Sequence, residues 1–294
     1  MGKALAGAFP ICRQTFDEAD AALGSSLSRI IFEGPDDQLT LTENAQPAIL
    51  TVSVAAGRLL ESKGFPRPAF VAGHSLGEYT ANVAAGTFSF ADALQIVRRR
   101  GRYMQEAVPV GTGAMAAILG LDADKVADAC REGAQGEVVS PANINGAGQI
   151  VIAGATAAVA RASERAKALG AKRAIPLPVS APFHCAMMKP AADRLAPELR
   201  ALTTREPRVP IVANVDAEPK RDAKSAIDAL IAQVASPVRW EAVVQRLAKE
   251  GVTTYVEVGP GTVLSGLVKK IHKDANVLSF GSPEDLAALD AIHV

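Results

Sequence analysis

The segment Phe70–Gly86, FVAGHSLGEYTANVAAG, places a serine between two glycines, Gly73-x-Ser75-x-Gly77. An apolar run precedes it and helix-forming residues follow it. Glycines at this spacing allow a sharp strand-to-helix turn that exposes the hydroxyl, and the amino end of the helix favours a developing oxyanion. We therefore expect Ser75 to be a nucleophile and the amide of Leu76 to be an oxyanion-hole donor. The alternative is a serine that only caps an ordinary helix.

A serine nucleophile needs a general base, and the chain has four histidines. His74 adjoins Ser75, so its side chain should leave the turn in another direction. His272 lies in the charged stretch KKIHK, and His293 is next to the carboxyl end. His184, in VSAPFHCAMMKP, follows the last strand expected of an inserted unit. Elimination of the other three assigns the base to His184, against the alternative of a structural histidine in an apolar loop.

The three cysteines, Cys12, Cys130 and Cys185, have no C-x-x-C spacing. Cys185 adjoins His184, but neighbouring side chains point apart, so a cysteine nucleophile is disfavoured. We expect reduced, buried thiols in a cytoplasmic protein, with no disulfide framework and no metal site.

Composition bounds the class of protein. The chain has 294 residues, of which 49% are hydrophobic, so it can bury a large core. Lys plus Arg and Asp plus Glu each number 31, and this balance argues against a nucleic-acid partner. No signal peptide and no membrane-length apolar run is present in the sequence. We therefore expect a soluble protein with no membrane partner.

Most of the chain alternates strand and helix patterns, which predicts a mostly parallel, covered sheet. The amino-terminal part contributes helical patterns before the first strand. The expected segments are helices at 13–23, 27–32, 44–62 and 91–106, strands at 68–72, 211–215, 254–258 and 277–280, and helices that begin at Ala223, Trp240 and Val263.

The middle of the chain has a different pattern, in which strand and helix segments follow the order β-α-β-β-α-β of a ferredoxin-like unit. Its expected segments are strands at 114–119, 138–143, 150–153 and 171–179, and helices at 124–132 and 156–169. We expect residues 110–179 to form an inserted small subdomain, and residues 1–109 and 180–294 to form a large α/β subdomain.

Several motifs, in order, resemble the malonyl-CoA:acyl carrier protein transacylase family. They are GHSLGEY, RRGRYMQEAVP, GAMAAILGL, VVSPANINGAGQIVIAG, VSAPFHCAMMKPAA and EVGPG. The chain is also similar to the acyltransferase domains of polyketide and fatty acid synthases. The resemblance implies an α/β-hydrolase-like large subdomain and a ferredoxin-like small one. It also implies that malonyl passes from malonyl-CoA through a malonyl-serine to the pantetheine thiol of acyl carrier protein, in fatty acid biosynthesis and without a metal or cofactor.

The resemblance also implies roles for individual residues. A backbone carbonyl, by position that of Gln233 in LIAQVASPVRW, would orient the histidine in place of a carboxylate. Leu76 and Phe183 fit the pattern of domains that select malonyl over branched substrates. Asn143 and Asn145 are candidates for the path of the thioester arm, although asparagines that form turns need no such role.

A malonyl group ends in a carboxylate, and the planar guanidinium of arginine binds carboxylates through two hydrogen bonds. The helix expected at 91–106 offers Arg98, Arg99, Arg100 and Arg102. Its apolar positions recur at three- to four-residue spacing and place Arg100 as the most buried of the four. The family's arginine falls on the same residue. Arg99 and Arg102 fit a solvated basic helix end.

The carrier protein is acidic, so a basic entrance is expected, with Lys189, Lys269, Lys270 and Lys273 as candidates. Lysines on a solvated helix are the ordinary alternative. We expect a monomer. Two other functions stay open: a thioesterase or esterase on the same serine turn, and an inactive scaffold subunit.

The amino end departs from the family pattern. Family members begin with a strand and a loop that resembles F-P-G-Q-G-S-Q, whose glutamine amide supplies an oxyanion-hole donor. Met1–Lys3 aligns just beyond this loop, which implies either a downstream start, the reading we favour, or a real variant. Because one such donor is worth about 10²–10³ in rate, we expect the chain as written to be weakly active and less stable than a version restored at its amino end.

Overall fold

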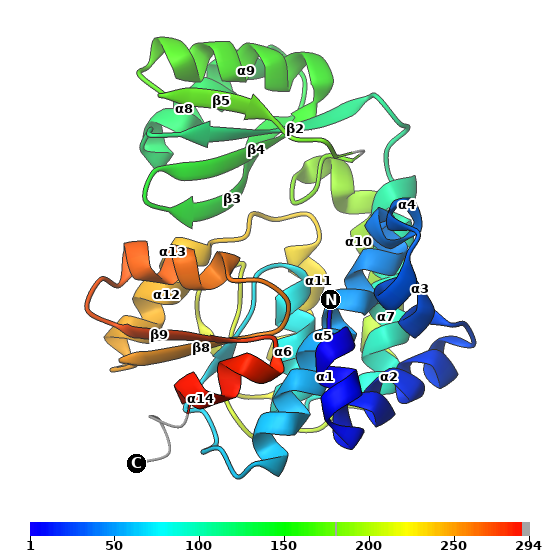
Figure 1. Cartoon of the computed structure of the whole chain (residues 1–294). Coiled ribbons are helices and arrows are strands. Elements are labelled where there is room, and N and C mark those ends of the chain that lie inside the picture. The colour runs from blue at the N-terminus through cyan, green and yellow to red at the C-terminus, as the bar shows by residue number, and fades with distance from the viewer. Residues whose placement is uncertain (180, 290–294) are drawn as a thin grey trace.

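The computed structural model describes residues 1–179 and 181–289, so Ser180 and His293 lie outside the described residues. A small subdomain with its own sheet lies on one end of a larger α/β body (Figure 1). Within the described residues, no helix is long and apolar enough to cross a membrane.

Helices form the amino-terminal part of the large body. They are α1 (Lys3–Ala8), α2 (Pro10–Leu23), α3 (Leu27–Glu33), α4 (Asp36–Thr40) and α5 (Thr42–Ser62). The helices expected at 13–23, 27–32 and 44–62 are confirmed, whereas the short α1 and α4 were not predicted. Pro10 starts α2 at a position where a missing N–H costs nothing, and Gly24 ends it in the left-handed region.

The strands of the large body form two separate sheets. β1 (Val71–Ala72) pairs in parallel with β6 (Ile211–Val212), which pairs antiparallel with β7 (Pro219–Lys220). β8 (Thr254–Val258) pairs in parallel with β9 (Asn276–Phe280). The predicted α/β class is confirmed. The strands expected at 68–72 and 211–215, however, are only two residues long, partly because prolines at 68 and 210 lack the N–H that a ladder needs.

Seven more α-helices pack around these sheets. They are α6 (Leu76–Ala85), α7 (Phe90–Glu106), α10 (Lys189–Arg200), α11 (Ala223–Gln233), α12 (Trp240–Lys249), α13 (Val263–Ile271) and α14 (Leu286–Leu289), with 3₁₀ turns at Ala186–Met188 and Pro283–Asp285. Among them α10 and α14 were not predicted. The side chain of Ser89 caps α7 by accepting a hydrogen bond from the amide of Asp92. A Cβ at Gly101 would lie 2.6 Å from the carbonyl oxygen of Thr42, so this glycine lets α7 approach α5 closely.

The small subdomain has the predicted βαββαβ order. Its elements are β2 (Gly113–Leu119), α8 (Ala123–Ala134), β3 (Val139–Gly146), β4 (Gln149–Ala155), α9 (Thr156–Ala168) and β5 (Arg173–Pro176). The sheet order is β3-β4-β2-β5 and every pair is antiparallel. Its core packs small side chains of both helices, such as Ala129 and Ala162, against Ile118 and Ile152 of the strands.

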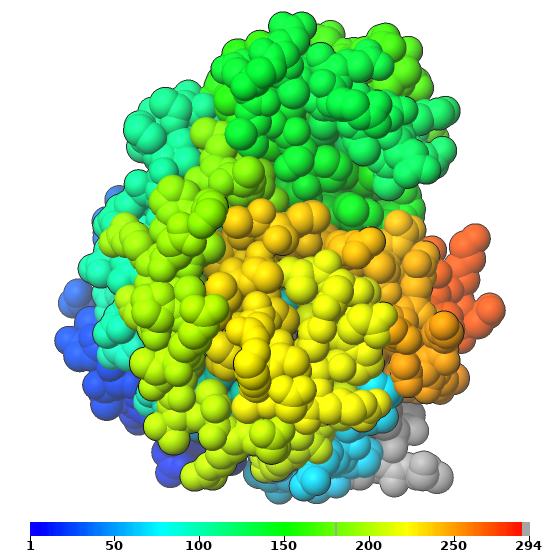
Figure 2. Space-filling model, turned by 180° about the vertical axis from the view of Figure 1, so that it is seen from behind, coloured from blue at the N-terminus to red at the C-terminus, as the bar shows by residue number. Residues whose placement is uncertain are grey.

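Backbone hydrogen bonds join the two subdomains. The amide of Ile144 in β3 donates to the carbonyl of Val238, and the amide of Val238 donates to the carbonyl of Ala142, each over 2.8 Å. Seen from behind, the small subdomain rests directly on the carboxyl-terminal part of the large body (Figure 2). Strand β3 is therefore fixed close to the segment that leads into α12.

Candidate active site

Ser75 lies on the turn between β1 and α6, with φ 50° and ψ −104°. This positive φ is a strained backbone conformation for a serine, and such strain recurs at reactive sites. A Cβ on Gly73 would lie 2.1 Å from the carbonyl of Gly77, whereas a Cβ on Gly77 would meet open space. Of the two glycines in the motif, the tight approach of the turn therefore requires only Gly73.

Asn214, two residues after β6, holds this turn from the neighbouring strand. Its Oδ1 accepts a hydrogen bond from the amide of Ser75 over 2.7 Å, and its Nδ2 donates to the carbonyl of Gly73 over 2.8 Å. The side chain is fully buried, so both bonds are shielded from water. The amide of Ser75 is thereby occupied. The next amide, that of Leu76, has no acceptor within the described residues, and its placement fits an oxyanion donor.

His184 reaches the serine from the segment that returns from the small subdomain. Its Nε2 lies 2.7 Å from Ser75 Oγ, and its Nδ1 lies 3.0 Å from the backbone carbonyl oxygen of Gln233. A carbonyl only accepts, so Nδ1 carries the proton and Nε2 faces the serine with a lone pair. Burial, together with the charge of Arg100, lowers the pKa of His184 to about 3. The imidazole is therefore neutral and can accept a proton from the hydroxyl.

Two other histidines lie elsewhere, as expected. His74 Nε2 lies 2.9 Å from Oδ1 of Asn145, and its ring packs beside that of Trp240. His272 caps α13 and its Nδ1 contacts the hydroxyl of Tyr255. The thiol of Cys185 donates to the carbonyl of Pro182, and burial raises its pKa, which disfavours a thiolate.

Arg100 projects from α7 to the same hydroxyl. Nη1 donates to Oε1 of Gln46 over 2.7 Å, while Nη2 donates to Oε1 of Gln233 over 2.9 Å and to Ser75 Oγ over 3.0 Å. Only 2% of Arg100 is exposed, whereas the side chain of Arg99 is 46% exposed and pairs with Glu198. The predicted burial of Arg100 is confirmed.

No carboxylate of the described residues forms a direct ion pair with the Arg100 guanidinium. Its hydrogen-bond acceptors on Gln46, Gln233 and Ser75 are neutral, and its Nε has no acceptor among the described residues. The buried carboxyl of Glu78 acts on it through Gln233 and not as a direct ion pair. A buried cation is costly unless a counter-charge accompanies it. The site is therefore suited to a carboxylate carried by a group on Ser75.

Glu78 is a buried acidic residue of the site that the sequence analysis missed. It lies in the first turn of α6 with 1% exposed, and burial raises its pKa to about 7. Its Oε2 accepts from the backbone amide of Asn214 over 2.9 Å and from Nε2 of Gln233 over 2.8 Å. The sequence analysis also missed Gln46, which accepts a hydrogen bond from Arg100.

The remaining candidate residues lie around this centre. Phe183 is half-buried and packs against core clusters of both subdomains. Asn143 and Asn145 lie on β3; Oδ1 of Asn143 is buried without a partner, whereas Oδ1 of Asn145 is engaged by His74. In addition to its carbonyl contact, Gln233 donates from Nε2 to the carbonyl of Ser75 over 3.0 Å.

Comparison with known proteins identifies the family. Residues 1–282 match the model of the acyl transferase domain. The chain belongs to the acyltransferase family. A relative from Escherichia coli (strain K12), named malonyl CoA-acyl carrier protein transacylase, is 51% identical over 284 residues, which cover 97% of this chain and 92% of the relative.

Solved structures agree with this acyltransferase assignment. An acyl carrier protein S-malonyltransferase from Vibrio cholerae has a TM-score of 0.97 at 47% identity and covers 98% of this chain and 94% of its own. A malonyl-transacylase in complex with a type II PKS acyl-carrier protein has a TM-score of 0.95 at 47% identity, over 97% of this chain and 92% of that one. The division into a large and a small subdomain is therefore that of the family.

The candidate lysines of this acyltransferase lie on the surface. Lys189 pairs with Asp193 over 2.7 Å on α10. Lys269, Lys270 and Lys273 are exposed at the end of α13 and form no ion pair with a described residue. Helix α13 also reaches the small subdomain, because a Cβ on Gly146 of β3 would lie 2.7 Å from the side chain of Ile271.

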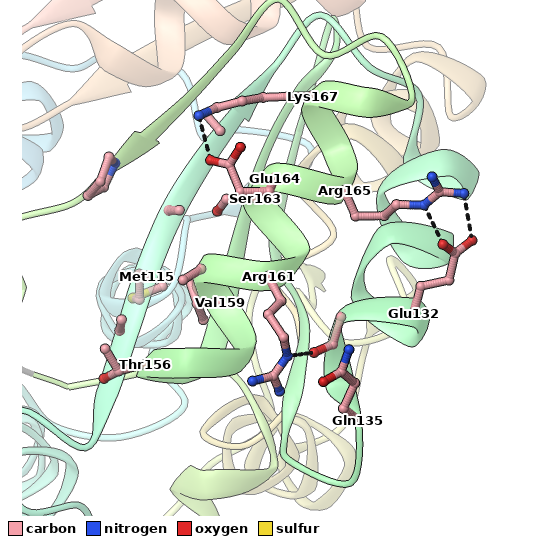
Figure 3. A pocket seen from close by; sticks show the side chains of 16 residues that line it. Met115, Glu132, Gln135, Thr156, Val159, Arg161, Ser163, Glu164, Arg165 and Lys167 are labelled. Atoms are coloured by element: carbon pink, nitrogen blue, oxygen red, sulfur yellow. Dashed lines mark hydrogen bonds and ion pairs between the residues drawn. The ribbon is translucent and has the colours of Figure 1, made fainter.

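A groove lies on the small subdomain, and Ser75 is not among the residues that line it (Figure 3). This groove of about 820 Å³ runs between α9, α8 and the β2–β5 edge. Its cations are already paired: Arg161 with Glu137, Arg165 with Glu132, and Lys167 with Glu164. The groove therefore offers no unpaired cation for an anionic ligand.

Proposed function

We propose that the chain transfers the malonyl group of malonyl-CoA to the pantetheine thiol of acyl carrier protein through a malonyl ester on Ser75. The observation that carries this proposal is the position of Ser75 Oγ, which lies 2.7 Å from His184 Nε2 and 3.0 Å from Arg100 Nη2. The names of the relatives, and the complex of one of them with a carrier protein, support the same reaction.

In the first step, the hydroxyl of Ser75 attacks the thioester carbonyl while His184 Nε2 takes its proton. The carbonyl of Gln233 stabilises the resulting imidazolium through Nδ1–H. The Leu76 amide, at the amino end of α6, stabilises the oxyanion. Collapse of the tetrahedral intermediate breaks the carbon–sulfur bond, and the departing CoA thiolate takes the proton back from His184.

The second step reverses these events with a different thiol. His184 removes the proton from the pantetheine thiol of the carrier, and the thiolate attacks the malonyl ester. The carbon–oxygen bond to Ser75 breaks, and its oxygen recovers the proton from His184. Each cycle returns the site to its starting state, so the proposed reaction consumes no metal, cofactor or oxidant.

Arg100 gives this site its preference for malonyl over uncharged acyl groups. Its guanidinium would exchange the hydroxyl contact for the malonyl carboxylate, with which it would form a direct ion pair. Leu76 and Phe183 would limit branching next to the thioester, although one methyl group is worth only about 1–3 kcal/mol.

The carrier would approach where the small subdomain meets the large body, close to α13 and β3. The exposed lysines at 269, 270 and 273 suit an acidic partner. Asn143 and Asn145 lie on β3, where they would contact the pantetheine arm. We place the protein in the cytoplasm as a monomer. Its three free, buried thiols fit a reducing compartment.

The competing activity is hydrolysis by the same serine. Malonyl-CoA is incubated with the protein in the presence and absence of holo-carrier, and release of CoA and malonyl-carrier are followed separately. If the protein is a transferase, one equivalent of CoA per protein is released without the carrier, and further release of CoA requires the carrier. Sustained CoA release without a carrier would instead show a thioesterase.

A further inference from the structure

Glu78 is the only buried acidic residue among the residues that the structure describes. No step of the proposed reaction uses it. Both hydrogen bonds of its side chain nevertheless come from residues that hold the reacting groups. One oxygen, Oε2, accepts from the amide of Asn214 and from Nε2 of Gln233. A single acceptor atom thus links two parts of the site that are otherwise supplied by different elements.

The first link leads to the nucleophile. The amide of Asn214 is fixed by Glu78, and the side chain of Asn214 bridges the carbonyl of Gly73 and the amide of Ser75. Since Ser75 is held at a positive φ, this bridge maintains the strained turn that presents the hydroxyl.

The second link leads to the base and to the anion-binding arginine. Gln233 directs its backbone carbonyl to His184 and its side-chain Oε1 to Arg100. Oε1 can face the guanidinium only if Nε2 faces the other way, where Glu78 accepts a hydrogen bond from it. A flipped amide would place an oxygen against the Glu78 oxygen and an NH₂ against a guanidinium N–H. Glu78 and the backbone carbonyl of Ser75, which accepts from the same Nε2 over 3.0 Å, are the acceptors that set the orientation of this amide, and Glu78 is the one supplied by a side chain.

We propose that Glu78 is a positioning residue whose Oε2 fixes the Gln233 amide toward Arg100 and, through Asn214, the turn that carries Ser75. The proposal rests on the proposed function for its substrate and on geometry for its mechanism. Because the role requires an acceptor atom at one place, a glutamine at position 78 can fill it, with its carbonyl oxygen at the Oε2 position and its NH₂ at the other.

The test measures kcat/KM for malonyl-CoA and acetyl-CoA, with holo-carrier, in the wild type and in Glu78→Gln, Glu78→Ala, Gln233→Ala and the double variant Glu78→Ala/Gln233→Ala. Labelling of Ser75 by an uncharged sulfonyl fluoride measures the reactivity of the serine with a reagent that has no carboxylate for Arg100 to bind. We expect Glu78→Ala to lower the malonyl-to-acetyl ratio about tenfold and to slow labelling, and Glu78→Gln to stay within about threefold of the wild type in both. The double variant should show the same ratio as Gln233→Ala alone.

A purely structural role gives a different pattern. If Glu78→Ala lowers malonyl and acetyl transfer equally, in step with the folded fraction, the proposal is wrong. It is also wrong if the two ratio losses multiply in the double variant, or if Glu78→Gln behaves like Glu78→Ala. Should Glu78→Ala not fold, Glu78→Asp, which withdraws the oxygen by one methylene, replaces it with the same expectations.

Glu257 provides the matched control. Its carboxylate also accepts two backbone hydrogen bonds, from the amides of Leu264 and Ser265, but at the start of α13. Glu257→Ala should lower the thermal midpoint and leave the malonyl-to-acetyl ratio unchanged. If the wild type transfers no malonyl, the proposed function fails, while the labelling rates of Ser75 in the Glu78 variants still decide whether Glu78 positions the turn.

Discussion

Arg100 Nη2 donates a hydrogen bond to Ser75 Oγ over 3.0 Å in the free protein. The cation that is proposed to bind the substrate carboxylate therefore contacts the nucleophile itself in the free protein. When malonyl is attached to Ser75, two carbons separate its carboxylate from the ester oxygen. The guanidinium therefore needs only to exchange one contact while Gln46 and Gln233 continue to hold it.

Arg100→Ala should reduce kcat/KM for malonyl-CoA by about 10²–10³, the effect of removing one partner of a buried charged pair. Acetyl transfer should fall much less, because acetyl has no carboxylate. Steady-state transfer to holo-carrier with both thioesters measures this. Arg99→Ala, on the exposed side of the same helix, is the control and should change neither rate. Equal losses for malonyl and acetyl in Arg100→Ala would make Arg100 structural.

The loss of activity at acid pH should begin at a lower pH than is usual for an enzyme with a histidine base. Because burial lowers the pKa of His184 to about 3, its Nε2 stays unprotonated well below pH 6.5. The rate of Ser75 acylation, followed in single-turnover experiments, should therefore stay flat from pH 8 to pH 5. Half-loss of the acylation rate near pH 6.5 would contradict the neutral, buried base.

The same shift predicts how stability depends on pH. Between pH 6.5 and pH 3 the unfolded chain binds a proton on His184 and the folded protein does not, so this contribution to stability is complete above pH 6.5 and is lost as the pH falls toward 3. Compared with His184→Ala, the wild type should thus lose more unfolding free energy between pH 7.5 and pH 5. Denaturant titrations at both pH values check the sign.

The two motif glycines should differ sharply when each is replaced by alanine. Gly73→Ala forces a Cβ to within 2.1 Å of the Gly77 backbone, so the serine turn must shift and labelling of Ser75 should be lost. Gly77→Ala meets nothing within 4 Å and lies in α6, where alanine favours the helix by roughly 0.5–1 kcal/mol. That variant should keep its activity. A loss of activity in Gly77→Ala would mean that a bound substrate fills the space.

Alanine variants of Asn143 and Asn145 should also differ from each other, one in substrate binding and the other in stability. Asn145 already binds His74 across the subdomain boundary, so Asn145→Ala leaves a buried ring nitrogen unpaired and should cost about 1–3 kcal/mol of stability. Asn143 has a free buried oxygen, so Asn143→Ala should raise KM for malonyl-CoA with little loss of stability. The reverse assignment would show that Asn145 contacts the thioester arm.

The fold could be predicted where periodicity and length are strong. The βαββαβ order of the insertion and the long α5 and α7 follow from apolar spacing that neighbouring residues share. The two-residue strands β1 and β6 could not be delimited, because nearby prolines lack the N–H that a ladder needs and the side chain of Asn214 binds the backbone of Gly73 and Ser75 in place of a ladder. The short α1, α4 and α14 are too brief to carry a periodic signal.

The candidate site could be predicted where a motif or a count constrained the choice. Ser75 has its turn motif, His184 was found by elimination, and Arg100 stands on the apolar side of a patterned helix. Glu78 and Asn214 were missed because their roles arise from partners 136 positions apart, which no local pattern encodes. The direction of the Gln233 carbonyl is equally a property of the folded chain.

The most direct test of the proposed mechanism is the intact mass of the protein after brief exposure to malonyl-CoA, followed by addition of holo-carrier. The mechanism predicts one malonyl increment on a peptide that contains Ser75, its absence in Ser75→Ala, and its transfer to the carrier when the carrier is added. An increment that persists in Ser75→Ala, or one that water removes before the carrier can accept it, would contradict malonyl transfer through Ser75.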